Sequence, residues 1–222
     1  MRKQILVASL LIFASSCALK PQTVVLNPVS IKPASAKLTE KKIHITTKDT
    51  RPMPQVLGVR HKQNLKFQIP FMKPQEIPYI NNNQKVTDVI TKIAEEYLVG
   101  DGFVVNENGI SLELSLAVLK YETLEKQWYQ MPRSKIQLFF TSQVKNESGV
   151  VVFNGRHEYA VENTYPLFQP RAKKNEQVIN EALSQGMKQI FTDHSLLDAL
   201  KAEPVKAEHS QAETATDTVK LM

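Results

Sequence analysis

The sequence predicts an α+β fold in two layers, with two main helices packed on one face of a mostly antiparallel sheet. Two segments place apolar residues at helical spacing, and several others alternate apolar with polar residues. The predicted elements follow the order strand, helix, several strands, helix, which is typical of helices gathered on one face of an antiparallel sheet. This single domain is expected to span residues 41–200, a usual length for one domain.

The first half of the domain predicts one strand and one helix. Residues 42–49 form a strand candidate because Ile43 and Ile45 alternate with polar residues. The next stretch, 50–83, contains repeated prolines and is expected to be irregular. Residues 84–102 then place apolar side chains at helical spacing and end in glycine, which can adopt the left-handed conformation of a helix C-cap.

The second half predicts a run of strands and two helices. The strand candidates cover residues 103–121, 134–145 and 150–163. The NESG sequence at 146–149 is expected to form the hairpin turn between the last two strands. A second amphipathic helix is predicted at 175–191 with Asn175 as its N-cap, and SLLDAL at 195–200 predicts a short closing helix.

The N-terminus has the three parts of an export signal. A positive end is followed by an apolar run from Ile5 to Phe13 and then by small residues at 14–16. The run is about nine residues long, whereas a membrane-spanning helix needs about 20. The small residues stand directly before Cys17, the only cysteine, and this arrangement resembles the bacterial lipobox. The alternative is a conventional signal whose cleavage site lies near a buried cysteine.

On the lipobox interpretation, residues 1–16 are a lipoprotein signal peptide. Cys17 then carries a covalent diacylglycerol and an N-acyl chain, and three acyl chains anchor a protein stably in a membrane. The residue after the cysteine is Ala18, and not the Asp that, by resemblance to enterobacterial lipoproteins, would favour retention in the inner membrane. We therefore expect the protein on the periplasmic leaflet of the outer membrane of a Gram-negative bacterium.

The two ends of the chain are expected to lie outside the domain. Residues 17–40 are interpreted as the lipidated N-terminus and a tether, with a candidate edge strand at 23–31 because Pro28 cannot sit in a central strand. Residues 201–222 contain no aromatic side chain and few large apolar residues. They are expected to form a disordered tail.

Composition predicts neither a nucleic-acid partner nor a metal. The net charge is +6, and loss of Arg2 and Lys3 with the signal lowers it to a mild +4. Attraction to anionic lipids or acidic cell-wall polymers is the alternative to a simple effect on solubility. The five histidines lack metal-ligand spacing, and the chain has no GxSxG, P-loop or GxGxxG motif. We therefore expect no metal, no cofactor and no catalytic residues.

Two short stretches are candidates for a binding or structural site. Asp49, Arg51 and Arg60 flank the end of a strand candidate, where an Arg–carboxylate pair would pin the irregular stretch to the sheet. Trp128 and Tyr129 lie in the connection between two long strands. Large aromatic side chains in such a loop either fold back on the sheet or contact a partner.

Taken together, the lipobox, the elements Asp49-x-Arg51 and Gly58-x-Arg60, the strand ISLELSLAVLKY and the closing SLLDAL resemble the YajG-like outer-membrane lipoproteins. The resemblance runs from about Cys17 to Leu200 and implies a location and a fold rather than an activity. The function we expect is a non-catalytic interaction or assembly module that binds an envelope protein. The alternative is a binder of a lipid-like or cell-wall glycan ligand, and an envelope hydrolase comes third.

Overall fold

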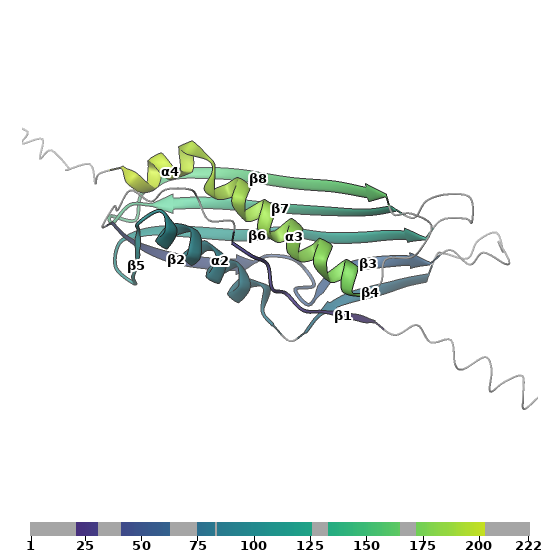
Figure 1. Ribbon diagram of the computed structural model, residues 1–222. Coiled ribbons are helices and arrows are strands. Elements are labelled where there is room, and N and C mark those ends of the chain that lie inside the picture. Colours follow the sequence, from purple (N-terminus) through teal and green to yellow (C-terminus); the bar gives the residue numbers. More distant parts are fainter. Residues whose placement is uncertain are drawn as a thin grey trace, which may run out of the picture.

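The protein is an α+β fold in which helices cover one face of an eight-stranded sheet (Figure 1). The computed structural model describes residues 21–30, 41–62, 75–82, 84–125, 133–164 and 172–202. The described strands are β1 (Gln22–Val24), β2 (Lys42–Asp49), β3 (Val56–Lys62), β4 (Gln75–Asn81), β5 (Val104–Val105), β6 (Ile110–Glu125), β7 (Arg133–Lys145) and β8 (Val151–Thr164). The described helices are α2 (Val86–Gly100), α3 (Ala172–Phe191) and α4 (His194–Lys201).

Strand β6 is the centre of the sheet. Along one side it pairs with β7, and β7 pairs with β8, in two consecutive antiparallel hairpins. Along the other side of β6, two strands follow one another. Strand β2 pairs in parallel with the first half of β6, up to Leu116, and β3 pairs in parallel with the second half, from Tyr121. Beyond β3 follow β4, which is antiparallel to β3, and then β1, which is parallel to β4.

The sheet is therefore mixed, and the prediction of a mostly antiparallel sheet was wrong. The pairs β1–β4, β2–β5, β2–β6 and β3–β6 are parallel. Apolar and polar residues alternate in the same way in both kinds of strand, so periodicity cannot reveal direction. Direction depends on the connection, and β2 returns to β6 through the crossover that contains α2.

The proline-rich stretch 50–83 is also more regular than predicted, because it contains β3 and β4. Pro78 lies inside β4, although proline cannot donate a hydrogen bond to a neighbouring strand. Strand β1 pairs with β4 only from Tyr79 onward. Among the described residues, Pro78 therefore stands at a point where β3 is the one neighbour of β4.

The predicted helices are confirmed, with one correction. Helix α2 ends before Gly102, whose φ of 89° is the left-handed conformation expected of a C-cap. Helix α3 begins at Ala172 rather than at 175. Asn175 is thus not an N-cap but a buried residue within the helix, and its amide binds other elements.

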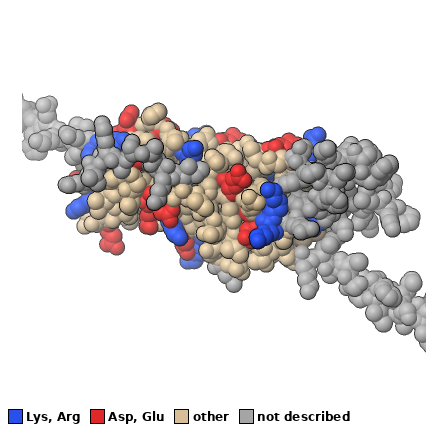
Figure 2. All heavy atoms as spheres, in the orientation of Figure 1, with Lys and Arg blue, Asp and Glu red and all other residues tan. Residues whose placement is uncertain are grey.

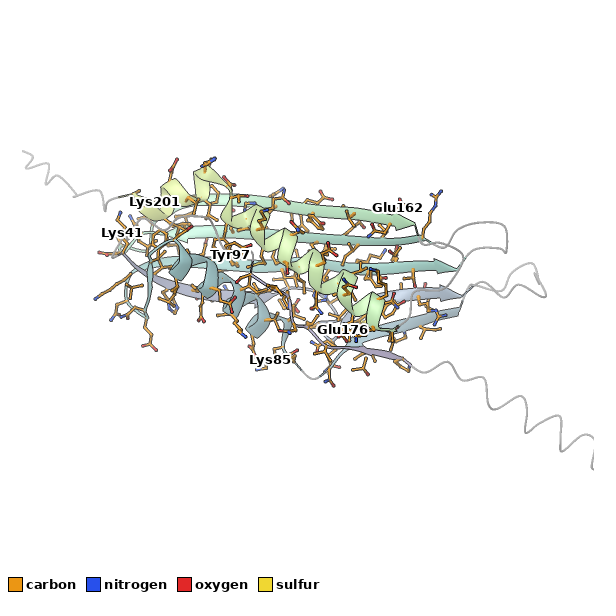
Figure 3. The ribbon with its side chains drawn as sticks, in the orientation of Figure 1. Lys41, Lys85, Tyr97, Glu162, Glu176 and Lys201 are labelled. Carbon is orange, nitrogen blue, oxygen red and sulfur yellow. The ribbon has the colours of Figure 1, made fainter. Side chains whose placement is uncertain are left out.

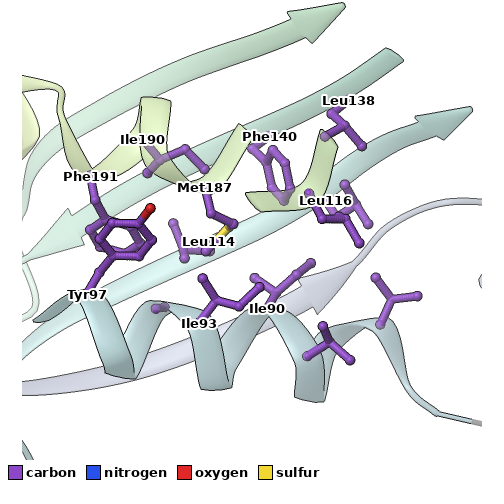
Figure 4. Packing of buried hydrophobic residues seen from close by; sticks show 14 of the residues in the cluster. Ile90, Ile93, Tyr97, Leu114, Leu116, Leu138, Phe140, Met187, Ile190 and Phe191 are labelled. Carbon is purple, nitrogen blue, oxygen red and sulfur yellow. The ribbon is translucent and has the colours of Figure 1, made fainter. Parts of the chain in front are cut away.

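One apolar core lies between the helices and the sheet (Figure 4). Tyr97 of α2 stacks on Phe191 of α3 with ring centroids 5.0 Å apart. Alternate residues of β7 point into this core while their neighbours face away from the helices, as in any half-covered strand. The core is made chiefly by Ile90, Ile93, Leu98, Leu112, Leu114, Leu116, Leu138, Phe140, Ile179, Leu183, Met187 and Ile190.

Candidate functional site

The N-terminal segment is fixed to helix α3 by side-chain hydrogen bonds. The backbone N–H of alternate residues donates to oxygens of three α3 side chains spaced four residues apart, and such spacing places them on one face of a helix. The bonds run from Val25 to Glu176 (3.1 Å), from Asn27 to Asn180 (2.8 Å) and from Val29 to Ser184 (3.0 Å). The Asn180 amide also donates to the Val25 carbonyl at 2.9 Å. Residues 22–29 are therefore part of the folded domain.

A buried polar cluster extends this attachment into the core. Tyr121 donates to Asn175 Oδ1 at 2.9 Å, and the Asn175 amide donates to Gln22 Oε1 at 3.0 Å. The hydroxyls of Tyr79 and Thr123 lie 2.8 Å apart beside them. These contacts join β1, β4, β6 and α3. The signal in the sequence was a single asparagine among the apolar positions of α3, which the prediction used as a cap.

The attachment limits the length of the predicted tether. Gln22 follows Cys17 by five positions, and an extended chain spans at most about 3.6 Å per residue. The Cα atom of Cys17 therefore lies within about 18 Å of that of Gln22. The predicted tether, 17–40, includes β1 and the segment fixed to α3, and β1 lies at the edge of the sheet.

Asp49 and Arg51 form a buried ion pair at the end of β2. The guanidinium donates to both carboxylate oxygens, from Nε at 2.8 Å and from Nη2 at 2.6 Å. It also donates to the carbonyls of Pro54 and Val56, at 2.7 and 3.0 Å. Only 5% of the Arg51 side chain and 9% of the Asp49 side chain is exposed. A pair so enclosed fixes the turn between β2 and β3.

This turn lies where the neighbour of β6 changes from β2 to β3. The Thr50 N–H donates to Leu116 O, the last bond before the change. Gly58 then brings β3 back against β6 so closely that an added Cβ would stand 1.9 Å from Tyr121 O. The glycine is needed for this close approach, because any side chain would push the two strands apart.

A cleft of about 480 Å³ opens beside the point where the strand paired with β6 changes from β2 to β3. Its walls come from the end of β2, the β2–β3 turn, the end of β4 and the start of α2, where Figure 3 labels Lys85. Lys85 provides no side-chain cap, so the first N–H groups of α2 lack a partner from it. The lining residues are Asp49, Pro54, Gln55, Ile80, Asn81, Gln84, Lys85, Val86 and Thr87.

Asn81 is the unusual residue of this cleft. It is 8% exposed, and its amide donates to Gln84 O. Its Oδ1 atom is buried and has no hydrogen-bond partner within the described residues. A buried acceptor without a partner is uncommon in a folded protein and marks a place where a water or a ligand donor is expected. The cleft thus holds one buried acceptor, Asn81 Oδ1, that a donor from outside the described residues could satisfy.

A serine, a histidine and an aspartate also meet between β7, β8 and α4. Ser142 Oγ lies 2.8 Å from His157 Nε2, and His157 Nδ1 lies 3.9 Å from Asp193 Oδ2. Burial lowers the pKa of His157 below its ordinary 6.5, and the charge of Asp193 partly opposes that shift. Ser142 is fully buried, and a nucleophile must be reached by its substrate. The cluster therefore joins three elements of the fold.

The other predicted site residues are placed apart from this cleft or outside the described residues. Arg60 lies in β3, in register with Ile77 and Thr123, and does not line the cleft. Cys17, Trp128 and Tyr129 lie outside the described residues. The roles predicted for all four remain predictions.

Charges of both signs are interspersed on the face shown in Figure 2. Within the described part of the chain, no three His, Cys, Asp or Glu side chains are grouped so that they could hold a metal ion. Helices long and apolar enough to cross a membrane are likewise absent from the described ranges.

The chain belongs to a family of bacterial lipoproteins. The family model described as "Uncharacterized lipoprotein" matches residues 28–201. Membership implies lipid modification and anchoring to a membrane through that lipid. No curated protein matches the chain.

Solved structures resemble this chain at low sequence identity. A Xanthomonas campestris protein of the DUF330 family matches with a TM-score of 0.50 and 9% identity, over 76% of this chain and 91% of that one. A minor lipoprotein from Acinetobacter baumannii matches with a TM-score of 0.41 and 13% identity, over 73% of this chain and 96% of that one. At such identities the first match indicates the fold alone.

Proposed function

We propose that the protein is a YajG-like lipoprotein of the outer membrane, facing the periplasm, and that it is a non-catalytic module that binds an envelope protein. The observation that carries the proposal is the attachment of residues 22–29 to α3. It holds the edge of the domain at Gln22 within about 18 Å of residue 17, where we place the lipid. A domain held so near the membrane surface is suited to partners that lie on or in the same membrane.

The polar clusters support binding rather than catalysis. The charges of Asp49 and Arg51 are paired with each other in a buried ion pair, and Ser142 of the histidine cluster is fully buried. The cleft beside the β2–β3 turn is lined by both polar and apolar residues, and it is the concave surface that an extended segment of a partner would enter. Its volume lies within the range of about 300–1,000 Å³ that is usual for ligand pockets.

The anchor is tested by the substitution Cys17→Ser. We expect loss of acyl labelling, because the serine oxygen does not replace the thiolate in the first acyl transfer. Density-gradient separation of the two membranes, with protease treatment of spheroplasts, tests the proposed leaflet. Acyl labelling that persisted in Cys17→Ser, or wild-type protein found only in the inner membrane, would contradict this part of the proposal.

The partner is tested by photo-crosslinking in intact cells. A photoreactive amino acid at Gln55 or Lys85 lies in the cleft, and one at Glu96, on the exposed side of α2, provides the matched control. We expect adducts with an envelope protein from the two cleft positions only. If Glu96 gave the same adducts, or neither cleft position gave any, the cleft would not be the binding surface.

A second candidate function is the binding of a cell-wall glycan or a lipid-like ligand in the same cleft. Asn81 Oδ1, which has no hydrogen-bond partner within the described residues, favours a ligand that donates a hydrogen bond, such as a glycan, over an acyl chain. Titration of the protein with a disaccharide-peptide fragment of peptidoglycan, followed by NMR, tests this alternative. Shifts confined to the residues that line the cleft would support it, and an unchanged spectrum would exclude that fragment as a ligand.

A further inference from the structure

Strand β8 is a long edge with a free side. It runs over 14 residues and, in the part of the chain that the structure describes, has β7 as its one partner strand. Figure 1 shows it at the margin of the sheet, with α3 crossing the face beside it. The outer side of such a strand presents backbone N–H and C=O groups that another strand can pair with.

The helix-facing row of β8 is incompletely covered. Phe153, Tyr159 and Val161 pack against the core but stay half-exposed. On β7, by contrast, the residues paired with these three, Val144, Leu138 and Ile136, are at most 1% exposed. The apolar layer therefore continues past the last place where the helices cover it. A further strand beside β8 would complete its burial.

Two copies of β8 can pair with each other so that the residues on either side of His157 face complementary residues of the second copy. When two copies pair antiparallel with His157 on the two-fold axis, directly opposite residues have numbers symmetric about 157. Arg156 then faces Glu158 of the second copy, and Phe153 faces Val161. Tyr159 faces Gly155, and aromatic side chains across from glycine are a favourable cross-strand pair.

Neighbouring registers lack these matches. Opposite residues must share a face, so the axis can move only in whole residues along the strand. An axis on Arg156 or Glu158 places like charges directly opposite each other. An axis on Tyr159 pairs Arg156 with Glu162 but leaves Glu158 facing Ala160. Only the His157 register gives both Arg156 and Glu158 an opposite charge.

We propose that the protein forms a two-fold dimer through antiparallel pairing of β8 with β8 of a second copy, centred on His157. The two sheets become one continuous sheet with the helices of both copies on the same face. The dimer goes beyond the envelope partner proposed above and does not require it. Because the axis is perpendicular to the sheet, both lipid anchors enter one membrane when the sheet lies parallel to that membrane.

Charge reversal tests the register. Arg156→Glu and Glu158→Arg each place like charges opposite one another, twice per dimer, and both side chains are exposed on the outer face. We expect each substitution to weaken dimerisation by about tenfold, and the double exchange to restore it. The control is Lys92→Glu, an equal change of charge on the exposed side of α2. Sedimentation equilibrium of the full mature lipoprotein in a density-matched detergent measures the association, and circular dichroism confirms folding.

The outcomes separate the alternatives. Weakening by both single substitutions, rescue by the double exchange and an unchanged control would support the dimer. Wild-type protein that stayed monomeric up to about 100 μM would overturn it. A normal dimer in Glu158→Arg would also overturn it, because only the His157 register places Glu158 opposite Arg156. Cleft crosslinks to an envelope protein test the proposed function separately, since these variants leave the cleft intact.

Discussion

The two sides of β6 are held together in different ways. On one side, β7 and β8 follow β6 in consecutive hairpins and are held by long backbone ladders. On the other side, short or parallel strands from distant parts of the chain are fixed by buried polar side chains. Strand β1 pairs with β4 over only three residues, and the Asp49–Arg51 pair and the Asn175 cluster reinforce this side.

The difference follows from the entropy of chain closure. A hairpin closes a short loop, and each added residue pair extends an existing ladder. A strand that arrives from far along the chain must be ordered before it gains many contacts, so a three-residue ladder is insufficient without further bonds. Side chains of α3 provide those bonds for β1, whereas β8 is held by its long ladder with β7 and has no second partner strand among the described residues.

The largest expected effect comes from breaking the ion pair at the end of β2. Arg51→Ala removes the guanidinium from both Asp49 oxygens and from the carbonyls of Pro54 and Val56, and leaves the buried carboxylate with the backbone N–H of residue 51. We expect a loss of about 3–5 kcal/mol in the free energy of unfolding, measured by urea denaturation. The double variant Asp49→Leu/Arg51→Met removes the buried charges and should recover much of the loss. Equal stability of Arg51→Ala and the wild type would show that the pair does not fix this side of the sheet.

The Asn175 cluster is the second test. Asn175→Ala removes the acceptor of Tyr121 and the donor to Gln22. Leaving buried polar groups unpaired should cost about 2–3 kcal/mol in urea denaturation. The control is Gln177→Ala, at an exposed position two residues further along the same helix. It should change the free energy of unfolding by less than about 0.5 kcal/mol. A similar loss in both variants would mean that the helix itself, not the cluster, was disturbed.

The bonds along α3 should have a smaller and more local effect. Asn180→Ala removes the contacts with Asn27 N–H and Val25 O, and we expect a loss of about 1–2 kcal/mol. Hydrogen exchange followed by mass spectrometry should show faster exchange in residues 22–29 and unchanged protection in β7. Unchanged exchange in 22–29 would show that β1 is held without these side chains.

The smallest expected effect is a dependence on pH from the other side of the sheet. The pKa of His157 is lowered by burial, so the unfolded chain binds a proton more readily than the folded one. His157 therefore stabilises the fold fully above about pH 6.5, and this contribution is lost as the pH falls toward its folded pKa. Thermal unfolding at several pH values should show a smaller decline in His157→Gln than in the wild type. Parallel curves would contradict the assignment.

The spacing of apolar residues predicted the helices and the long strands because one face of each element is buried in the core and the other faces away from it. Helix α2 is covered by the sheet on one side only, so its buried residues recur at helical spacing. Strands β3 and β4 were missed, since prolines and a glycine at close approach are read as breaks in regular structure. Of the candidate site, Asp49 and Arg51 were identified as a candidate pair, but the cleft was not, because it is formed by segments distant in sequence.

By itself, the sequence determined the class of the fold and the positions of its main helices, because each depends on residues close together in the chain. The export signal with its lipobox is likewise a local pattern and stays a prediction. Only the tertiary structure decided the directions of the strands, the attachment of residues 22–29 to α3 and the place of β8 at the edge of the described sheet. These features depend on which distant segments meet, and Asn175 shows the physical reason. The same amide that caps a helix in a local pattern can instead bind two buried partners from other strands.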